Sequence, residues 1–377
     1  MYWHVVCSTS VQTHNNNNVF REKVLKAAVY YGAKDIRSTD VADPKLTEDH
    51  SVLVEVLATS ICGSDLHLYR GALDPIMEKG HSQTGHELIG RVLETGSSVG
   101  KFKVGDRVTM GYSCSCGECY MCEVGQTAHC ETTEKAVYGF GVAFGDLNGT
   151  HSEALILPHA DGHVMKVPDA ISDAAALTLS CNLPSAIIAN NLADIKPGEN
   201  VALLGCGPTG LMALDIAINK APGVLVAIDK ESYRLDVARK KGAVTINAND
   251  SDWKEQALAQ SGGRGFDKVI EVVGYPETLQ MALDIIRPGG TIAAIGVFCD
   301  QEFNLVLADV FLRDITLHMN GFANVQPYMW EGLRLMERGV LNPEEYFTHD
   351  FKLSDIDKAY ALFHKKSDNA MKLLIRP

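Results

Sequence analysis

The sequence predicts an α/β protein that combines a β-rich domain with a doubly wound parallel sheet. Short β-rich runs broken by Gly, Pro and Asp extend from Lys23 to about Pro168, a pattern typical of a barrel-like β domain. From about Lys196, apolar strands alternate with helix-like stretches, which indicates a parallel sheet with helices on both faces. A glycine-rich turn follows the first of these strands and indicates a nucleotide site.

Each region supplies its own set of expected elements. In the first region the β-rich runs are KVLKAAVYY, SVLVEVLATS, LIGRVLETGSSV, DRVTM, SEALILP and HVMKVP. In the second region the expected strands are VALLG, VLVAID, VTINA, KVIEVVG, GTIAAIG and ITLHMN. Helix-like stretches such as PTGLMALDIAINK and SYRLDVARKKG separate most of these strands. The closing MKLLIRP is expected to return to the first domain as a strand.

Composition limits the class of protein and its partners. The 377 residues are 46% hydrophobic and 21% charged, which suits a globular chain of two or three domains. A net charge of −13 argues against a nucleic-acid surface. No apolar run approaches the ~20 residues that span a bilayer, so no membrane partner is expected. Ten cysteines in so long a chain fit a reducing, cytoplasmic location better than a disulfide framework.

The first twenty residues form a separate segment. They contain no Lys or Arg, so they match neither a secretory signal nor a transit peptide. The run from Asn15 to Asn18 is of low complexity. We expect residues 1–20 to be a disordered tail, native or not, and exclude them from the fold.

Four cysteines form a C-x2-C-x2-C-x7-C pattern in a loop-like stretch. They are Cys116, Cys119, Cys122 and Cys130. This spacing lets one loop present four thiolates in the tetrahedral arrangement of a structural zinc site. The alternative is a set of loop cysteines or a disulfide knot, which suits small secreted chains.

A second motif, G-x-G-x-x-G, lies between an expected strand and an expected helix. It consists of Gly205, Gly207 and Gly210. In this context the glycines allow a tight turn, close approach of a pyrophosphate and packing of helix on strand. Asp229 ends the next strand about twenty residues on and would bind the ribose 2′-hydroxyl, favouring NAD over NADP. Asp229 could instead be a helix N-cap. The basic residues Lys230 and Arg234 could weaken the preference for NAD over NADP.

Three further residues supply the ligand set of a catalytic zinc. Cys62 ends a strand, His86 lies in a G-H-E-x2-G-x5-G-x2-V pattern, and Cys181 precedes a helix. Each alone is weak, since a buried Cys is more often a small hydrophobe than a ligand. Together they offer two thiolates and one imidazole, which leaves a fourth position for water or substrate oxygen.

With these motifs in this order, the chain resembles the zinc-dependent medium-chain dehydrogenase/reductase family, the alcohol dehydrogenase superfamily. The resemblance covers nearly everything from Lys23 to Pro377. It implies a GroES-like catalytic domain over residues 21–186 and 325–377, with a structural zinc lobe at about 111–131. A Rossmann NAD-binding domain is expected over residues 187–324. Two zinc ions per chain and NAD are the expected cofactors.

The resemblance also implies roles for single residues. Glu87 falls where the family has a carboxylate that transiently approaches the metal, and Ser64 and His67 fall where a proton relay lies. Ser185 falls near the nicotinamide, and Lys372 falls where a basic residue is frequent. Simpler roles stay open: an ion pair for Glu87, a turn hydrogen bond for Ser64 and a surface imidazole for His67.

The chain departs from the family pattern at two places, and one further cysteine adds an ambiguity. Cys181 stands where the formaldehyde- and threonine-dehydrogenase-like branch often has Asp. Gly-Thr-His-Ser-Glu-Ala at 149–154 replaces the usual G-G-x-A-E-Y. Cys114 lies close to the four-cysteine pattern and makes its membership ambiguous. The first two departures leave the substrate undetermined and do not affect the expected fold.

The resemblance implies an NAD-linked oxidoreductase that interconverts an alcohol with its aldehyde or ketone through a zinc-bound substrate oxygen. The alternative enzyme is a formaldehyde-type dehydrogenase or dismutase that acts on aldehyde hydrates and holds NAD tightly. A non-enzymatic NAD(H)-binding protein would be expected to have lost a zinc ligand or the relay, and this chain keeps both. GTIAAIG and ITLHMN are expected at one edge of the parallel sheet, where the resemblance implies pairing into a homodimer or homotetramer. An unpaired apolar edge would be a liability, which argues against a monomer.

Overall fold

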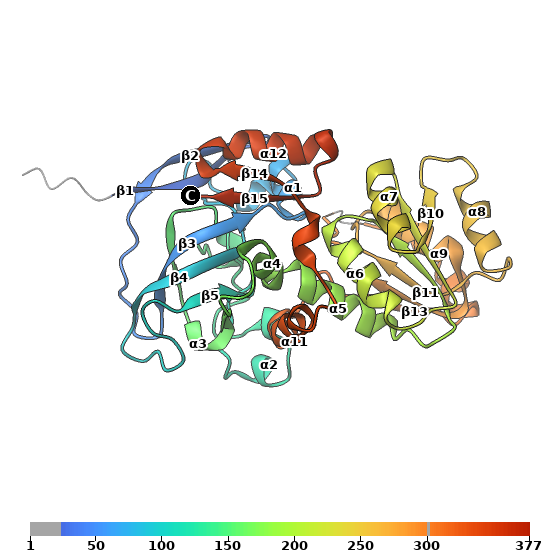
Figure 1. Cartoon of the computed structure of the whole chain (residues 1–377), viewed down its shortest axis with the longest axis horizontal. Coiled ribbons are helices and arrows are strands. Elements are labelled where there is room, and N and C mark those ends of the chain that lie inside the picture. The colour runs from blue at the N-terminus through green and yellow to red at the C-terminus, as the bar shows by residue number, and fades with distance from the viewer. Residues whose placement is uncertain (1–23, 300–301) are drawn as a thin grey trace, which may run out of the picture.

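The computed structural model describes residues 24–299 and 302–377, so the tail expected over residues 1–20 lies outside it. The described chain forms two units, one rich in strands and one of the α/β type, joined by helices at the centre (Figure 1). No helix in these ranges is long and apolar enough to cross a membrane. The helices are α1 (Asp65–Tyr69), α2 (Tyr120–Glu123), α3 (Ala160–His163), α4 (Asp173–Leu177), α5 (Asn182–Ala193), α6 (Pro208–Ile218), α7 (Ser232–Lys240), α8 (Trp253–Gln260), α9 (Pro276–Ile285), α10 (Leu307–Leu312), α11 (Gln326–Glu337) and α12 (Ile356–Lys365).

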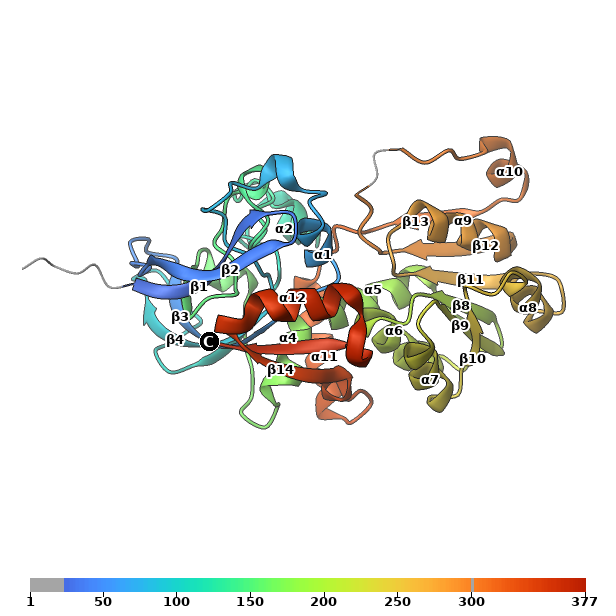
Figure 2. The same ribbon diagram turned by 90° about the horizontal axis from the view of Figure 1, so that it is seen from above.

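The first unit is built on a mixed sheet with the strand order β14-β15-β3-β4-β5-β7, and β6 also pairs with β3. A hairpin of β1 and β2 lies beside it. Helix α12 covers β14 and β15 on one side (Figure 2). The strands of this unit are β1 (Val24–Gly32), β2 (Asp35–Ala42), β3 (Val52–Ser60), β4 (Leu88–Thr95), β5 (Arg107–Met110), β6 (Ala154–Leu157), β7 (Val164–Lys166), β14 (Phe347–Lys352) and β15 (Lys372–Arg376).

Every β-rich run predicted for this unit contains a strand, and the closing strand returns as predicted. In β15, Leu374 pairs with Ser60 of β3 in an antiparallel register. The sequence did not indicate β2 or β14. Both are largely polar; β2 fully buries only Ile36, and β14 has no fully buried residue, so the apolar signal of both strands is weak.

The second unit contains a parallel sheet with the strand order β10-β9-β8-β11-β12-β13. Each of the six predicted strands is present. Side chains alternate along β8: Val201 and Leu203 join one core cluster, whereas Ala202 and Leu204 join another. Helices therefore cover both faces of the sheet. The strands are β8 (Asn200–Leu204), β9 (Val224–Asp229), β10 (Val244–Asn247), β11 (Phe266–Glu271), β12 (Ile286–Ala294) and β13 (Thr316–Met319).

The strand order of this sheet locates its ligand crevice. The chain runs outward from β8 to β10 and then crosses back to β11 on the other side of β8. In open α/β sheets, ligands bind at such a switch point, outside the carboxyl ends of the strands. The glycine motif directly follows β8 and therefore lies at this crevice.

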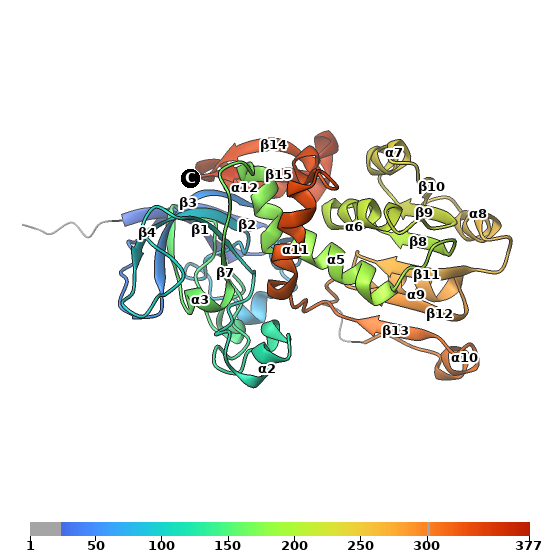
Figure 3. The ribbon, with the colours of Figure 1, turned by 60° about the horizontal axis from the view of Figure 1, so that its bottom comes forward.

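Helices α5 and α11 lie against each other between the two units (Figure 3). They contribute Leu183 and Leu333 to a core cluster that also contains Ile89 of the first unit and Val201 of the second. A shared core of this kind fixes the relative position of the two units. The expected domain boundary between residues 186 and 187 falls inside α5 and stays a prediction.

Candidate metal and nucleotide sites

The predicted ligands of the catalytic metal meet where the two units join. Cys62 follows β3, His86 precedes β4, and Cys181 immediately precedes α5. One ligand atom from each of these residues and one from Glu87 all lie within 4.8 Å of one another. Two sulfurs, an imidazole and a carboxylate form a donor set that suits Zn²⁺. The side chains present therefore fit the expected metal.

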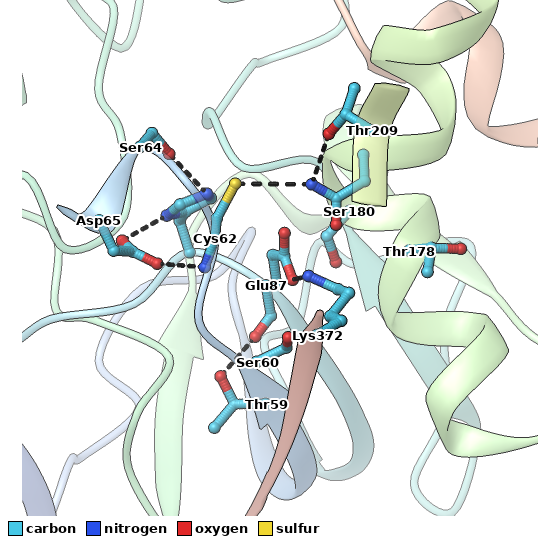
Figure 4. Close-up of polar contacts among 12 residues, drawn as sticks. Thr59, Ser60, Cys62, Ser64, Asp65, Glu87, Thr178, Ser180, Thr209 and Lys372 are labelled. Atoms are coloured by element: carbon cyan, nitrogen blue, oxygen red, sulfur yellow. Dashed lines mark hydrogen bonds and ion pairs between the residues drawn. The ribbon is translucent and has the colours of Figure 1, made fainter. Parts of the chain in front are cut away.

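Asp65, which the sequence did not single out, orients two of these ligands (Figure 4). One carboxylate oxygen lies 3.0 Å from His86 Nδ1, and the other accepts a hydrogen bond of 2.7 Å from the backbone N–H of Cys62. A carboxylate on Nδ1 fixes the tautomer that presents Nε2 to a metal. The available signal was the acidic residue three positions after Cys62.

The pKa values of the Cys62 and Cys181 thiols shift in opposite directions. A hydrogen bond with Cys181 holds the pKa of Cys62 well below its ordinary value, and His86 reinforces the shift although burial opposes it. The same hydrogen bond and burial raise the pKa of Cys181 well above its ordinary value. Close approach of the two sulfurs therefore favours one thiolate over two unless a cation is bound.

Glu87 forms an ion pair, the simpler role considered for it from the sequence. Its carboxylate also lies within the group of metal ligands. Its Oε2 lies 2.7 Å from Lys372 Nζ, and both side chains are buried (Figure 4). Burial raises the pKa of Glu87 to about 7, although the charge of Lys372 opposes the shift. A cofactor contact of Lys372 and a metal contact of Glu87 both stay predictions.

The two residues of the expected proton relay lie beside the ligand set. Ser64 Oγ is 3.4 Å from His86 Nε2, and Ser64 makes no side-chain capping bond to α1. His67 is only 7% exposed, and its ring centroid is 5.9 Å from that of Tyr275. His67 is therefore a cavity residue rather than a surface imidazole.

The segment 149–154, which departs from the family pattern, contains His151. This is the second residue near the metal ligands that the sequence did not single out. His151 is fully buried and hydrogen-bonds with Thr84 Oγ1 at 3.2 Å and Tyr360 Oη at 3.4 Å. A Cβ on Gly85 would lie 2.5 Å from this ring. His151 therefore packs under the residue that precedes His86, and burial lowers its pKa to about 4.

The glycine motif forms a tight loop between β8 and α6. Gly205 has a φ of +97°, and a Cβ on Gly210 would lie 1.9 Å from the carbonyl oxygen of Gly205. Neither position admits a side chain without distortion. The N-terminus of α6 follows this loop, and such helix ends bind anions. The loop thus fits the pyrophosphate of a dinucleotide.

Asp229 ends β9, as predicted, and faces the same loop. Its two carboxylate oxygens accept hydrogen bonds from the backbone N–H of Cys206 at 2.6 Å and of Glu231 at 2.8 Å. The N-cap of α7 is Glu231, so Asp229 is not the N-cap of this helix. Arg234 is buried and also lines the cavity.

One cavity of about 1050 Å³ joins the metal ligands to the glycine loop. Ser185, in the first turns of α5, also lines this cavity. Glu87 lies outside the lining. The predicted site residues that line the cavity are Cys62, Ser64, His67, His86, Cys181, Ser185, Gly205, Gly207, Gly210, Asp229 and Lys372.

The four-cysteine pattern forms a separate group. Its sulfur atoms lie within 4.8 Å of one another, with Cys116 4.0 Å from Cys122 and 3.6 Å from Cys130. Zn–S bonds of 2.3 Å in a tetrahedron require sulfur separations of about 3.8 Å. Although burial opposes it, the backbone N–H groups of Cys122 and Glu131 lower the pKa of Cys119 to about 6. The group therefore fits a structural zinc.

Cys114 is not part of this group. Its thiol donates to the carbonyl oxygen of Pro158 at 3.5 Å and packs in the apolar core of the first unit. Burial raises its pKa beyond the usual range. The ambiguity in the sequence therefore resolves in favour of the four predicted cysteines.

The geometry at Asp65 yields a prediction about metal affinity. Asp65→Asn should weaken zinc binding at the Cys62 set about 10–100-fold, because His86 loses the carboxylate that orients it. Competition with a chromophoric chelator measures this affinity. The exposed Asp40→Asn serves as the matched control and should leave it unchanged. Equal affinities in the Asp65 variant and the control would contradict the assigned role of Asp65.

Comparison with known proteins agrees with this geometry. The family of alcohol dehydrogenase GroES-like domains matches residues 48–169, and the family of zinc-binding dehydrogenases matches residues 208–338. A probable zinc-binding alcohol dehydrogenase of Mycobacterium tuberculosis is 35% identical and covers 94% of this chain and 89% of its own. A sorbitol dehydrogenase of Bacillus subtilis is 30% identical, with coverage of 94% and 97%.

Solved structures give the same result. The alcohol dehydrogenase of Thermus sp. ATN1 superposes with a TM-score of 0.85 at 34% identity, covering 93% of this chain and 99% of that one. Fold, motif order and relatives agree over nearly the whole described chain. The chain therefore belongs to the zinc-dependent medium-chain dehydrogenase/reductase family of the alcohol dehydrogenase superfamily.

Proposed function

We propose that this protein is a zinc-dependent, NAD-linked oxidoreductase that interconverts an alcohol with its aldehyde or ketone. The observation that carries the proposal is the shared cavity, which is lined by both the Cys62, His86 and Cys181 set and the glycine loop. Hydride transfer requires the reacting carbon of the substrate to lie beside the nicotinamide. A single cavity that opens onto both sites meets this requirement.

Zinc, when bound, would supply a Lewis acid that polarises the oxygen of the substrate, and NAD would supply the hydride acceptor. The protein supplies position and proton transfer. Ser64 presents its hydroxyl at the ligand set, where it can exchange a proton with a substrate hydroxyl. His67 lies one helical turn further along and passes that proton outward, since an imidazole gains and loses protons near neutral pH.

Two side chains, those of Asp65 and Asn182, support this arrangement. Asp65 holds His86 in one tautomer, with Nδ1 on its carboxylate and Nε2 3.4 Å from Ser64 Oγ. Asn182 Nδ2 donates to Cys62 Sγ at 3.5 Å and to Thr209 Oγ1 at 3.1 Å, which links a metal ligand to the first turn of α6. These contacts keep the metal site and the nucleotide loop at a fixed separation.

The preference for NAD rests on Asp229. Its carboxylate lines the cavity at the end of β9, where it would accept from a ribose hydroxyl and repel a 2′-phosphate. Lys230 and Arg234 also line this end of the cavity, and their positive charges weaken the preference for NAD over NADP. Two zinc ions per chain are part of the proposal, one at each ligand group.

The proposed assembly is a homodimer or homotetramer through the edge of the parallel sheet. Strand β13 pairs with β12 alone among the described strands. Helix α10 stands at this outer edge (Figure 2) and exposes Leu307, Phe311 and Leu312 by 73–79%. An open edge beside exposed apolar side chains favours pairing with a second copy. The zinc-binding thiols require a reducing compartment, and we propose the cytoplasm.

Cys62→Ser tests the catalytic role of the ligand set. Turnover of any alcohol should fall at least about 10³-fold, because the metal loses a thiolate ligand and the Lewis acid is weakened or lost. NADH affinity, measured by fluorescence, should change little because the glycine loop is intact. Cys114→Ser is the matched control, since a serine can also donate to Pro158. Turnover near the wild-type rate in the Cys62 variant would refute the proposal.

Asp229→Gly tests the cofactor assignment. It should raise the KM for NAD about 10–100-fold through loss of a charged hydrogen bond, and improve the use of NADP. Asp229→Asn keeps an acceptor oxygen but removes the repulsion, so it should relieve the exclusion of NADP at a smaller loss of NAD affinity. An unchanged ratio of kcat/KM for the two cofactors in both variants would rule out this role.

A further inference from the structure

Five rings form a closed circuit on the metal side of the cavity. We call them the aromatic collar: His86, Phe140, Phe144, Phe322 and Tyr112. In that order, successive ring centroids are 5.4, 6.4, 6.0 and 6.1 Å apart, and the last pair, Tyr112 and His86, is 6.1 Å apart. All lie within the 4.5–7 Å range of favourable ring contacts. The collar therefore begins and ends at a metal ligand.

The collar forms one wall of the large cavity, because each of its members lines that cavity. Three of its rings, those of Phe140, Phe144 and Phe322, are only partly buried. Val137 adds a further apolar side chain to the same wall. Partly exposed aromatic rings in a concave site indicate an apolar ligand, because the free site leaves this surface in contact with water.

Apart from the imidazole of His86, the polar group of the aromatic collar is the hydroxyl of Tyr112, and it is already hydrogen-bonded. The hydroxyl of Tyr112 donates to the carbonyl oxygen of Ala323 at 2.9 Å. Several charged residues that line the cavity have partners of their own: Arg70 donates to Tyr275, Lys366 pairs with Glu231, and Lys372 pairs with Glu87. Asp229, Lys230 and Arg234 belong to the nucleotide end. A substrate side chain at the collar thus meets rings rather than hydrogen-bonding groups.

We propose that the aromatic collar is the subsite for the substrate side chain. The substrates are then alcohols, and the matching aldehydes or ketones, that carry a bulky apolar group, preferentially an aryl group. This inference rests on the proposed function and specifies its substrate class. A polyol is disfavoured, because its remaining hydroxyls would lose water at this wall without gaining partners.

Family membership alone does not decide this point. A relative of this chain is named a sorbitol dehydrogenase, and others are named alcohol dehydrogenases. The collar also depends on both units of the chain. Tyr112, Phe140 and Phe144 come from the segment between β5 and β6, whereas Phe322 follows β13 of the parallel sheet.

The test measures NAD-linked kcat/KM of the zinc-loaded enzyme for benzyl alcohol, 3-phenyl-1-propanol, ethanol and sorbitol. We expect the two aryl alcohols to exceed ethanol and sorbitol by at least about tenfold, since even one methylene in an apolar pocket is worth about that much. Preference for ethanol or sorbitol would overturn the inference and leave the proposed function standing. Loss of activity on every alcohol with both NAD and NADP would overturn the function and the inference together.

Variants of the collar test the same inference within one protein. Phe140→Ala should lower kcat/KM for the aryl alcohols about tenfold or more and change that for ethanol far less. Phe140→Leu should recover part of the loss, because it restores apolar contact without the ring. Phe322→Ala should repeat the effect from the other unit.

The control is Val142→Ala, in the same loop between Phe140 and Phe144. Val142 is 54% exposed and does not line the cavity, so this variant should keep the aryl-to-ethanol ratio of the wild type. Zinc content and NADH affinity, measured in each variant, separate a local effect from misfolding. Equal losses for aryl alcohols and ethanol in folded Phe140 and Phe322 variants would contradict the role of the collar.

Discussion

We propose that the arrangement at the centre of the molecule depends on a divalent cation at the Cys62, His86 and Cys181 set. Two sulfurs and the carboxylate of Glu87 lie within 4.8 Å of one another in a buried region. Asp65 adds a further negative charge beside His86. Lys372 supplies a positive charge through its ion pair with Glu87. Burial of several like charges at such a distance is unfavourable unless they are paired with a cation or neutralised by protons. A bound cation turns the same groups into ligands and stabilises the cluster.

This constraint also explains how the two units share one site. The ligands come from three separate segments, and Cys181 directly precedes α5, the helix that enters the common core. Asn182 continues the connection from Cys62 to the first turn of α6. Ser185, on the same helix, lines the cavity that also contains the metal set and the glycine loop. The junction that would hold the proposed metal therefore also positions the glycine loop, the pair Ser64 and His67, and the aromatic collar relative to one another.

The sequence predicted those features that are local in the chain. The spacing of four cysteines within fifteen residues predicts a metal site, and the spacing of three glycines within six residues predicts a nucleotide loop. The alternation of strands and helices likewise predicted the parallel sheet. Asp65 was missed because its role depends on contact with His86 in another segment, although its position three residues after Cys62 was a signal. His151 was missed because its partners, Thr84 and Tyr360, are distant in the sequence. The aromatic collar could not be found from spacing, because Phe322 reaches it from the other unit, and β2 and β14 were missed because their sequences are largely polar.

The metal content of the purified protein tests the central claim most directly. Elemental analysis of the chain expressed with zinc should give two zinc ions per chain. A mild chelator should remove the zinc at the cavity first, because the Cys62 set leaves one ligand position open, whereas four thiolates close the other site. Turnover should disappear with that first ion and return when zinc is added back. One zinc ion per chain in a fully active enzyme, or activity that survives removal of the first ion, would contradict the account.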